Sequence, residues 1–523
     1  MLLLCSCVLL CAVLITRFSD KIGVPALILF MGLGMIFGLG MPFDDYTLTE
    51  RICTLALIFI IFYGGFGTKW SAAKPVAAKS VLLSTIGVLV TAGLTGLFCK
   101  LVLRIDALES FLIGAVLSST DAASVFSILR SKNLNLKNGT SSMLEIESGS
   151  NDPVAYMLTV IIISMMKGKV SLFSIGSMFI LQIALGTFIG IAIAYIGVII
   201  FKKTPLIAEG LESIFIIALA LSSYAVADYL GGNGFLSVYL TGIILGNSKI
   251  RNKKVLVNFF DGVTLLGQIF IFFLIGLLSF PKEISNIIFI SIPIALFLGL
   301  IARPIAIFMI LKPFRASVNQ CLLVSFAGLR GAASIVFAIM AVAGGVPLEN
   351  DLFHIVFVIS LLSVAIQGTF LPLVVKKLNM VDDDSDVLKT FNDYQEKAPI
   401  TLMRVFVPKE HPWVNKTIGE ARLPKGTLAV MIKRDDENII PKGDTVILEN
   451  DSVILSIPEY DFKDDIKLSE ILITKDHIWC NKRISELELP DDVLIALIKR
   501  GEKNIIPQGK NHIRENDIVV MYN

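Results

Sequence analysis

Residues 118–156 read SSTDAASVFSILRSKNLNLKNGTSSMLEIESGSNDPVAY. This stretch joins two apolar segments that both carry acids, Asp121 in the first and Glu147 and Asp152 in the second. A charge at the bilayer centre costs about 2.5–3.5 kcal/mol even on a lenient insertion scale. Three acids would cost on the order of 10 kcal/mol, comparable to the roughly 5–15 kcal/mol that keep a whole domain folded. The acids must be paired, hydrated or functional, and we interpret the stretch as a cation and proton site.

The composition indicates a membrane protein with a soluble tail. The chain has 523 residues, of which 54% are hydrophobic and 17% are charged, and its mean hydropathy is +0.76. A soluble protein has about 25% charged residues. The charges are uneven, because residues 1–375 are charge-poor and residues 376–523 are charge-rich. We therefore expect a membrane domain followed by a soluble domain rather than a soluble enzyme.

The cysteines and histidines exclude two common site types. Six of the seven cysteines fall in apolar segments, where cysteine behaves as a small hydrophobic residue, and no spacing suits zinc or a disulfide framework. None of the four histidines lies beside the membrane acids, so a histidine relay is not expected. The apolar N-terminus lacks a positive leading region and a small-residue cleavage site, so we interpret it as the first transmembrane helix.

Apolar runs that approach the roughly 20 residues of a spanning helix recur along residues 1–378. The sequence predicts thirteen of them, and hence an all-α polytopic membrane domain. The runs are 1–17, 22–41, 51–68, 76–103, 107–129, 141–166, 171–201, 208–229, 234–247, 256–280, 285–311, 317–345 and 351–375. The ninth run is short and rich in glycine, which makes it the least regular.

The loops between these runs alternate in basic content, which predicts their orientation. Lysine and arginine concentrate in every second loop, at Arg17, Lys21, Lys69, Lys74, Arg130, Lys132, Lys137, Lys202, Lys203, Lys249, Arg251, Lys253, Lys254, Lys312, Arg315, Lys376 and Lys377. Lys100 and Arg104 are the main exceptions. Because basic loops face the cytoplasm, we expect the N-terminus outside and the C-terminal tail in the cytoplasm.

The tail contains an internal repeat. After an acidic linker, residues 379–398, the pattern WVNK at 413–416 returns as WCNK at 479–482. The patterns IKR at 432–434, NIIP at 438–441 and END at 449–451 return unchanged at the same offset. A constant offset without a gap indicates a duplicated module. Because alternating apolar residues in LMRVFV and TLAVMIKR predict strands, we expect a small α+β tail of two repeats, 399–459 and 460–523.

The polar residues of the sixth run lie on one helical face. Glu147, Ser148, Asn151 and Asp152 follow a helical stripe, and their oxygens suit hard monovalent cations. Pro153 lacks an N–H and so frees the carbonyl of residue 149, which adds a backbone ligand and a kink. In the fifth run, residues 118–121 could interrupt the helix, which is tolerated only beside a cavity. The alternative is that these polar residues serve as structural glue between helices.

Two arginines in late runs have to neutralise acids or helix ends. Arg303 lies in LIARPIAIF and Arg330 in SFAGLRGAASIVF. Their two positive charges and the three negative charges of Asp121, Glu147 and Asp152 leave a net charge of −1. One uncompensated negative charge is what a site that alternates between one proton and one monovalent cation requires.

Several motifs resemble the monovalent cation:proton antiporter family, in particular its bacterial potassium/proton branch. They are GLGMIFG, the pair Gly64-Gly65, STDAASVF, LEIESGSNDPVAY, LIARP and GLRGAASIVFA. The resemblance covers residues 1–380 and implies a thirteen-helix homodimer with inverted repeats, in which the fifth and twelfth helices break and cross. It also implies the inner or plasma membrane of a prokaryotic cell.

The resemblance also implies roles for individual residues. Asp152 would bind the cation and the proton, and its neighbours Asn151, Asp121, Thr120 and Ser148 would contribute to the site. Glu147 would pair with Arg303, and Arg330 would balance the charge at the helix crossing. Electrogenic relatives carry two adjacent acids where this chain has Asn151-Asp152, so the resemblance implies electroneutral exchange.

The duplicated tail module resembles the TrkA-C domain of potassium-conductance regulators. That resemblance implies paired modules and an anionic regulatory ligand such as a cyclic dinucleotide, for which the candidate contacts are Lys433, Arg434, Lys499 and Arg500. A solvated strand end is the alternative for these four residues. After residue 380 there is no GxGxxG fingerprint, so NAD or ATP is not expected. We expect no cofactor and no nucleic-acid partner.

Three classes of function remain open on the sequence. A secondary antiporter is our prediction, with K⁺ as the preferred cation because of the branch resemblance and Na⁺ as the alternative. A ligand-gated potassium channel would explain the tail, but the chain has no TVGYG-like filter. A membrane-anchored sensor would explain the tail too, but it leaves the buried acids without a purpose.

Overall fold

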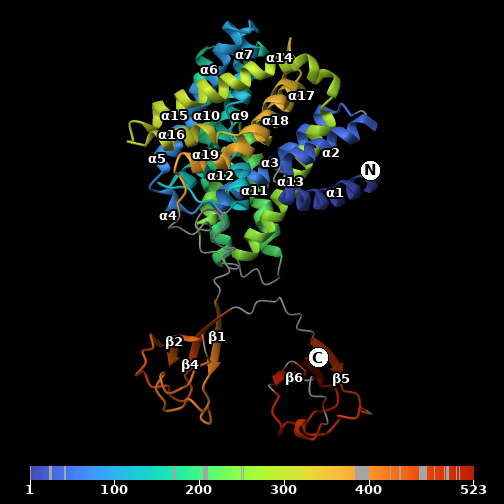
Figure 1. The fold of residues 1–523 in the computed structure, drawn as a ribbon, viewed down its shortest axis with the longest axis vertical. Coiled ribbons are helices and arrows are strands. Elements are labelled where there is room, and N and C mark those ends of the chain that lie inside the picture. The colour runs from blue at the N-terminus through green and yellow to red at the C-terminus, as the bar shows by residue number, and fades with distance from the viewer. Residues whose placement is uncertain are drawn as a thin grey trace. The chain divides into compact units, whose positions relative to one another are not determined.

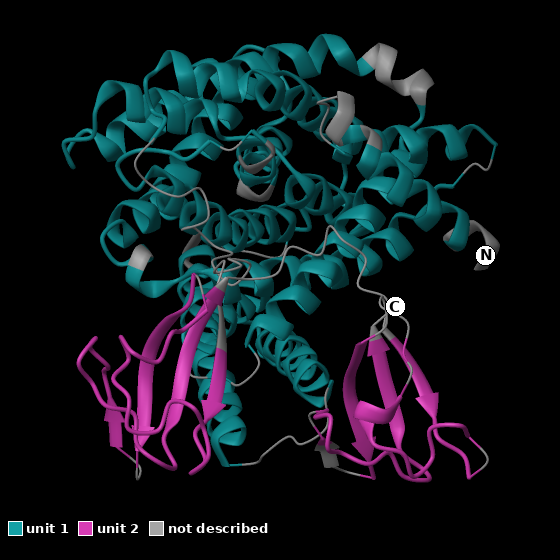
Figure 2. Cartoon of the chain, turned by 60° about the horizontal axis from the view of Figure 1, so that its bottom comes forward, with its two compact units in different colours: residues 1–396 teal, residues 397–523 magenta. Residues whose placement is uncertain are grey.

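The chain divides into two compact units, residues 1–396 and residues 397–523 (Figures 1 and 2). The structure is a computed structural model, and it describes residues 2–22, 26–40, 43–132, 134–168, 172–203, 210–248, 250, 253–382, 400–424, 426–434, 437–458, 468–475, 477–487, 489, 494–501, 503–505 and 507–522. Most of the predicted linker 379–398 lies outside this range, as do the basic loop residues Lys249 and Arg251.

In its described part, the first unit consists of helices and the segments that join them, with an isolated β-bridge between Leu136 and Val381. Its helices are α1 (Leu2–Ile22), α2 (Ala26–Gly40), α3 (Tyr46–Gly67), α4 (Trp70–Ala73), α5 (Ala77–Leu82), α6 (Val88–Leu101), α7 (Ala107–Val116), α8 (Ala122–Ser131), α9 (Thr140–Met166), α10 (Leu172–Lys203), α11 (Leu211–Tyr229), α12 (Gly234–Gly246), α13 (Lys253–Leu278), α14 (Pro281–Phe297), α15 (Arg303–Leu311), α16 (Val318–Phe326), α17 (Ala332–Ala343), α18 (Leu352–Leu362) and α19 (Thr369–Lys377). Three π-helical segments, η1 (Leu83–Gly87), η2 (Leu298–Ala302) and η3 (Ser363–Gly368), join α5 to α6, α14 to α15 and α18 to α19.

Seven helices in the described part are long and apolar enough to cross a membrane. They are Tyr46–Gly67, Ala77–Leu101, Ser174–Lys203, Leu211–Tyr229, Lys253–Leu278, Ile287–Leu311 and Leu352–Lys377. The chain is therefore a helical membrane protein, as its composition predicts. Each of the thirteen predicted runs lies over at least one helix, but the number of thirteen spans stays a prediction.

Two of the predicted runs are interrupted near their middle. The run 107–129 consists of α7 and α8 with a non-helical link between Val116 and Ala122. The run 317–345 consists of α16 and α17 with a similar link between Phe326 and Ala332. These two links are far apart in the sequence, and together they form the centre of the candidate site described below.

Glycines allow several pairs of helices to touch backbone to backbone, among them α3 with α12 and α2 with α13. A Cβ atom on Gly65 of α3 would lie 2.3 Å from the carbonyl oxygen of Tyr239 in α12, and one on Gly34 of α2 would lie 2.1 Å from that of Phe273 in α13. Such close crossings are how membrane helices gain packing energy where lipid offers no hydrophobic drive. The short α12, which the sequence marks as the least regular run, is thereby fixed against α3.

In the residues that the structure describes, the second unit contains two four-stranded antiparallel sheets of the same order. The first contains β1 (Ile400–Phe406), β2 (Leu428–Arg434), β3 (Glu437–Ile439) and β4 (Ser452–Pro458) in the order β1-β4-β2-β3. The second contains β5 (Leu468–Leu472), β6 (Leu494–Arg500), β7 (Lys503–Ile505) and β8 (Ile518–Tyr522) in the order β5-β8-β6-β7, and the short helix η5 (Ile484–Glu486) precedes β6.

The repeat in the sequence is thus a repeat in the structure. The register shifts once in each sheet, between Ala429 and Met431 in the first and between Ile495 and Leu497 in the second. These positions are equivalent in the two copies of the repeat. Each sheet buries its own small apolar core, around Ile432 in one and Ile498 in the other.

Candidate functional site

The two helix interruptions meet each other. The backbone N–H of Asp121, in the link between α7 and α8, donates a 2.8 Å hydrogen bond to the carbonyl of Leu329, in the link between α16 and α17. Each link leaves backbone groups that no helical ladder satisfies. Their contact satisfies two of these groups inside the protein, which is the condition for irregular backbone at membrane depth.

Arg330 lies at the carbonyl end of α7. Its Nη1 atom donates to the carbonyl oxygens of Ser118 and Ser119, at 3.1 and 2.7 Å, and its side chain is buried. The last carbonyls of a helix carry a partial negative charge, so a guanidinium there is stabilised. Among the described residues, the hydrogen bonds of the Arg330 side chain thus join it to a helix end.

Asp121 caps the second half of the same interrupted helix. Its carboxylate accepts hydrogen bonds from the backbone N–H of Ser124 at 3.1 Å and from the Ser124 hydroxyl at 2.5 Å. It also lies against the first turn of α17, because a Cβ atom on Gly331 would be 2.4 Å from its Oδ2 atom. The positive ends of α8 and α17 therefore both face this carboxylate and compensate its charge.

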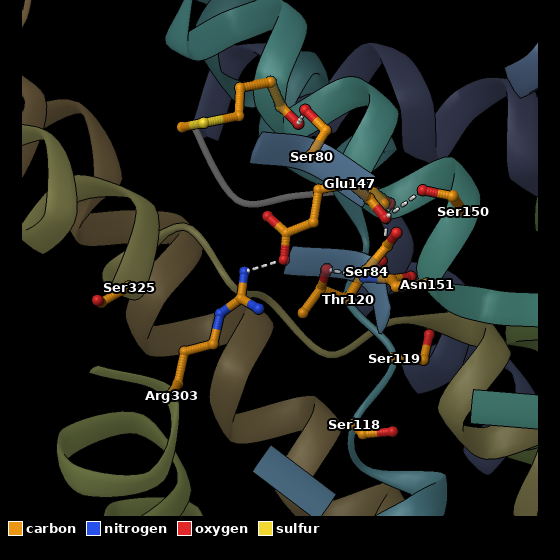
Figure 3. Close-up of polar contacts among 12 residues, drawn as sticks. Ser80, Ser84, Ser118, Ser119, Thr120, Glu147, Ser150, Asn151, Arg303 and Ser325 are labelled. Carbon is orange, nitrogen blue, oxygen red and sulfur yellow. Dashed lines mark hydrogen bonds and ion pairs between the residues drawn. The ribbon is translucent and has the colours of Figure 1, made fainter. Parts of the chain in front are cut away.

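The polar stripe on α9 faces the interruption. Ser148 donates to the carbonyl of Thr120 at 2.7 Å. The Asn151 amide donates to the Thr120 hydroxyl (Figure 3). Asp152 accepts a hydrogen bond from the Ser119 hydroxyl. Three predicted site residues, Thr120, Ser148 and Asp152, are thus brought together, and Asn151 lies beside them with its side chain fully buried.

Glu147 points away from this group toward Arg303. The Arg303 Nη2 and Glu147 Oε1 atoms are 2.6 Å apart (Figure 3), and their side chains are 3% and 1% exposed. A buried charge is stable only with such a partner. The segment η2 ends immediately before Arg303. A Cβ atom on Gly328 would lie 2.7 Å from the Nε atom of Arg303, so the absence of a side chain at Gly328 leaves space for the arginine.

A cavity of about 390 Å³ opens onto Asp152. Its α9 lining is Glu145, Ser148, Gly149 and Asp152, so it reaches Asp152 only from the N-terminal side of that helix. Asp121 and Asp261 also line it. The net charge of −1 counted from the sequence is therefore incomplete, because Glu145 and Asp261 add two acids that the count omits.

Aromatic rings occupy the other side of Asp152. Tyr156, one turn further along α9, packs against Phe235 with the ring centroids 4.9 Å apart and against Phe337 at 5.9 Å. Phe235 in turn packs against Tyr224 at 5.0 Å. This cluster, which we call the aromatic plug, joins α9, α11, α12 and α17. The site is thus wide on one side and filled with packed rings on the other.

Five site features were not predicted from the sequence. Glu145, Asp261, Thr264 and Gln268 line the cavity, and the Asn233 side chain donates a 2.7 Å hydrogen bond to the carbonyl of Pro153. A signal for the cavity residues existed in the chain, since EIESGSND and DGVTLLGQ place an acid, a hydroxyl and a further polar residue at the same spacing.

Three of the four candidate ligand contacts in the tail, Arg434, Lys499 and Arg500, form ion pairs within their own modules. Arg434 forms two 2.8 Å hydrogen bonds with Asp451, and Arg500 forms two 2.7 Å hydrogen bonds with Asp517. Lys499 lies 2.6 Å from Glu470. Burial acts to raise the pKa of Asp451, but the hydrogen bonds from Arg434 and Leu448 and the charge of Arg434 outweigh it, so that the pKa lies below its ordinary value.

Comparison with known proteins identifies the membrane unit. Residues 7–377 match the family described as the transmembrane sodium/hydrogen exchanger. The chain belongs to this exchanger family. It is a multi-pass membrane transporter that exchanges a monovalent cation for protons, and the channel and sensor alternatives are not supported. Residues 402–463 and 468–522 each match the TrkA-C domain.

Individual relatives of this exchanger are bacterial and archaeal. The K(+)/H(+) antiporter NhaP2 of Shewanella sp. (strain ANA-3) is 33% identical over 453 residues, which cover 84% of this chain and 78% of the relative. The K(+)/H(+) antiporter NhaP of Alkalimonas amylolytica is 32% identical over 454 residues, 85% of this chain and 79% of the relative. The Na(+)/H(+) antiporter 1 of Methanocaldococcus jannaschii is 27% identical, over 65% of this chain and 82% of the relative.

A solved structure shares the fold of this exchanger. The sodium proton antiporter MjNhaP1 from Methanocaldococcus jannaschii, determined at pH 8, aligns with a TM-score of 0.64 and 23% sequence identity. The alignment covers 71% of this chain and 97% of the other. The helical unit therefore has an NhaP1-like fold.

Proposed function

We propose that the exchanger moves K⁺ against H⁺ with Asp152 as the carboxylate that both ions share. The observation that carries this proposal is the difference among the three acids near the crossing. Glu147 faces Arg303 and Asp121 faces two helix N-termini, whereas Asp152 lines the cavity and is held, among the described residues, by the neutral Ser119 hydroxyl. A cation or a proton is then the partner that neutralises Asp152.

The neighbouring oxygens complete the proposed site. The hydroxyls of Ser119 and Ser148 and the carboxylate of Asp121 line the same cavity as Asp152. Oxygen atoms of this kind replace the hydration shell of a hard cation, as carbonyls do in ion-selective pores. Because one proton or one cation neutralises Asp152, and Asn151 adds no second exchangeable charge, exchange is electroneutral.

Alternating access would follow the packing around Asp152. In the arrangement described here the cavity side is accessible and the aromatic plug closes the opposite side. A ligand shifts such an equilibrium only by binding the two states differently. In the proposal both ions bind at Asp152. In each turnover the side of the aromatic plug opens to the solvent while the side of the cavity closes.

The remaining features of the proposal concern the whole molecule. It places thirteen spans with inverted repeats in the membrane of a prokaryotic cell, the N-terminus outside, the tail in the cytoplasm and two chains in a homodimer. The cavity then opens to the cytoplasm, since the basic loop residues Lys69, Lys137 and Lys253 lie next to the helix ends that surround it. The tail would regulate exchange by binding an anionic ligand, and Arg434 and Arg500 could take part only if their aspartate pairs open.

The choice between K⁺ and Na⁺ as the transported cation rests on the relatives. The two relatives at 32–33% identity are named as K(+)/H(+) antiporters, and they align with more of this chain than the relative named as a Na(+)/H(+) antiporter. We therefore propose K⁺ and keep Na⁺ as the second candidate.

The test is ion flux in proteoliposomes with a pH-sensitive dye inside. A gradient of K⁺, Rb⁺ or Na⁺ is imposed, and the cation that drives proton movement fastest identifies the substrate. The rate should not change when a membrane potential is imposed. Asp152→Asn should abolish exchange while the protein still inserts and folds, and removal of residues 397–523 should change its regulation. Normal exchange by Asp152→Asn would exclude Asp152 as the carrier.

A further inference from the structure

The wall of the cavity opposite α9 carries a second polar stripe. Asp261, Thr264 and Gln268 of α13 line it at positions i, i+3 and i+7, which lie on one helical face. Glu145, Ser148 and Asp152 of α9 line the same cavity at the same spacing. Each stripe therefore runs from a carboxylate near the start of its helix, past a hydroxyl, to a third polar group about 10 Å deeper, since a helix rises 1.5 Å per residue.

The hydroxyl of Thr264 indicates that this second stripe faces a ligand. Thr264 is 9% exposed, and its Oγ1 atom has no hydrogen-bond partner among the residues that the structure describes. A threonine inside a helix ordinarily donates to the carbonyl one turn earlier. Leaving a buried hydroxyl without a partner costs about 1–3 kcal/mol, so its partner is expected in the cavity that it lines. Structural glue between helices would have given this hydroxyl a protein partner.

Asp261 lies at the exposed end of the stripe, where an ion would arrive. It is solvent-exposed, and its Oδ1 atom accepts a 3.3 Å hydrogen bond from the hydroxyl of Tyr63 in α3. Tyr63 also lines the cavity. The tyrosine holds the carboxylate toward the cavity and supplies one more oxygen atom.

The charge of the cavity favours cations at every depth. The described side chains that line it include the four acids Asp121, Glu145, Asp152 and Asp261, and no lysine, arginine or histidine. A low-dielectric cleft lined by one sign of charge focuses the field and raises the local counter-ion concentration and association rate by about 10- to 1,000-fold.

We propose that α13 holds a second cation site, made of the Asp261 carboxylate and the hydroxyls of Tyr63 and Thr264. A dehydrating K⁺ or Na⁺ occupies this site before it moves to Asp152. The proposal rests on the proposed function in one respect, namely that Asp152 is the site of exchange. The second site sets the cation concentration at which exchange from the cavity side is half-maximal, and it leaves proton binding at Asp152 unchanged.

The kinetic test uses everted membrane vesicles, which present the predicted cytoplasmic face to the medium. Asp261→Asn should raise the half-saturating K⁺ concentration about tenfold, and Thr264→Val should raise it severalfold. In both variants the half-saturating proton concentration should stay within twofold of wild type. Asp261→Glu and Thr264→Ser, which keep the charge and the hydroxyl, should restore K⁺ dependence. Asp44→Asn, at an exposed acid outside the cavity, is the matched control.

A binding measurement separates the two sites. Rb⁺ is added to purified protein at constant ionic strength with choline as the counter-salt, and the thermal midpoint is followed. Asp152→Asn should still be stabilised by Rb⁺, whereas Asp152→Asn/Asp261→Asn should not. Equal stabilisation of these two variants, or an unchanged K⁺ dependence in Asp261→Asn, would overturn the second site. Exchange that survives in Asp152→Asn would instead overturn the proposed function.

Discussion

At the scale of single residues, three acids in one sequence stretch have three different environments. Glu147 meets a guanidinium, Asp121 meets the N-termini of two helices, and Asp152 meets a hydroxyl beside a cavity. The energetic problem that the sequence poses is the same for each, because each would cost several kcal/mol unpaired. Under the proposed function, Asp152 is the one of these three acids whose charge is balanced by the transported ion.

The pair of Glu147 and Arg303 should be coupled strongly. Glu147→Gln leaves Arg303 buried without its counter-charge, and removal of one member of a buried pair costs about 3–5 kcal/mol. Arg303→Met should have a similar effect for the opposite reason. The double variant removes both charges, so it should be more stable than the sum of the two single effects predicts. Thermal unfolding of the purified protein in detergent measures all three.

Additive losses in that cycle would contradict the pairing. Glu50→Gln, which changes an acid at a half-exposed position outside the pair, serves as the matched control and should shift the midpoint little.

At the scale of elements, the site depends on two interrupted helices that pack without space between them. A Cβ atom on Gly331 would lie only 2.4 Å from the Oδ2 atom of Asp121. Real Cβ atoms essentially never lie under 3.0 Å from such an atom, so even alanine forces the Asp121 side chain or the two links to shift. The hydrogen bond from Asp121 to Leu329 joins the links at the same place.

Gly331→Ala should therefore impair folding and exchange together. We expect a loss of about 2 kcal/mol or more, as for overpacked cores, with the crossing as the region that loosens. Hydrogen exchange of peptides from residues 107–131 and 318–343 measures this directly. Gly93→Ala is the control, because a Cβ atom there meets nothing within 4 Å. Equal protection of the crossing in both variants would show that the links tolerate the atom.

The aromatic plug should keep the far side of the site closed. Phe235 is 2% exposed and contacts Tyr156, Tyr224 and Phe337. Phe235→Ala would leave a large cavity beside Asp152, at a cost of about 3–5 kcal/mol, and water should then reach the site from both sides. The expected result is a proton leak in proteoliposomes that needs no exchanged cation. Leu300→Ala, at an exposed apolar position, should cause no leak.

The sequence could predict the elements that a charge makes conspicuous. Asp152, Glu147, Arg303 and Arg330 each interrupt an apolar run, so their energetic cost identifies them. The α13 stripe is harder to recognise, because Asp261 lies only two helical turns after Lys253 and resembles a polar helix end.

Other parts of the site depend on distant contacts. Thr264 and Gln268 carry no charge, so their cost in a membrane helix is small. The closeness of Asp121 and Gly331 involves segments from different halves of the membrane unit, and no local pattern determines it. The repeat of the tail was predictable because comparing the chain with itself is enough to detect it.

At the scale of the whole molecule, the second unit is stabilised by the same ion pair twice. Arg434 with Asp451 and Arg500 with Asp517 join a strand end to the turn before the last strand of each module. Both aspartate side chains are fully buried. Each also accepts a backbone N–H, from Leu448 and Arg514. The candidate regulatory arginines are therefore structural in this arrangement.

Asp451→Asn should destabilise the first module and leave the second unchanged. The substitution removes a charged acceptor of several hydrogen bonds, which costs about 1.5–3 kcal/mol. Hydrogen exchange of β2 and β4 should rise while that of β6 and β8 stays constant, and Asp517→Asn should give the reverse pattern. Each variant is thus the control for the other, and a change in both modules would show that they unfold as one.

The same pairs fix how the tail responds to acid. Burial acts to raise the pKa values of Asp451 and Asp517, but the arginine and backbone hydrogen bonds outweigh it, so both lie below the ordinary 3.8. A depressed folded pKa contributes stability that is complete above 3.8 and disappears as the pH falls through the lower folded value. Trp413 and Trp479 pack against the module cores, so their fluorescence in a Trp70→Phe background follows unfolding. The tail of the wild type should be more stable than that of Asp451→Asn/Asp517→Asn, and this difference in stability should disappear only below about pH 4. A stability difference that stays constant down to pH 2 would contradict the assigned pairs.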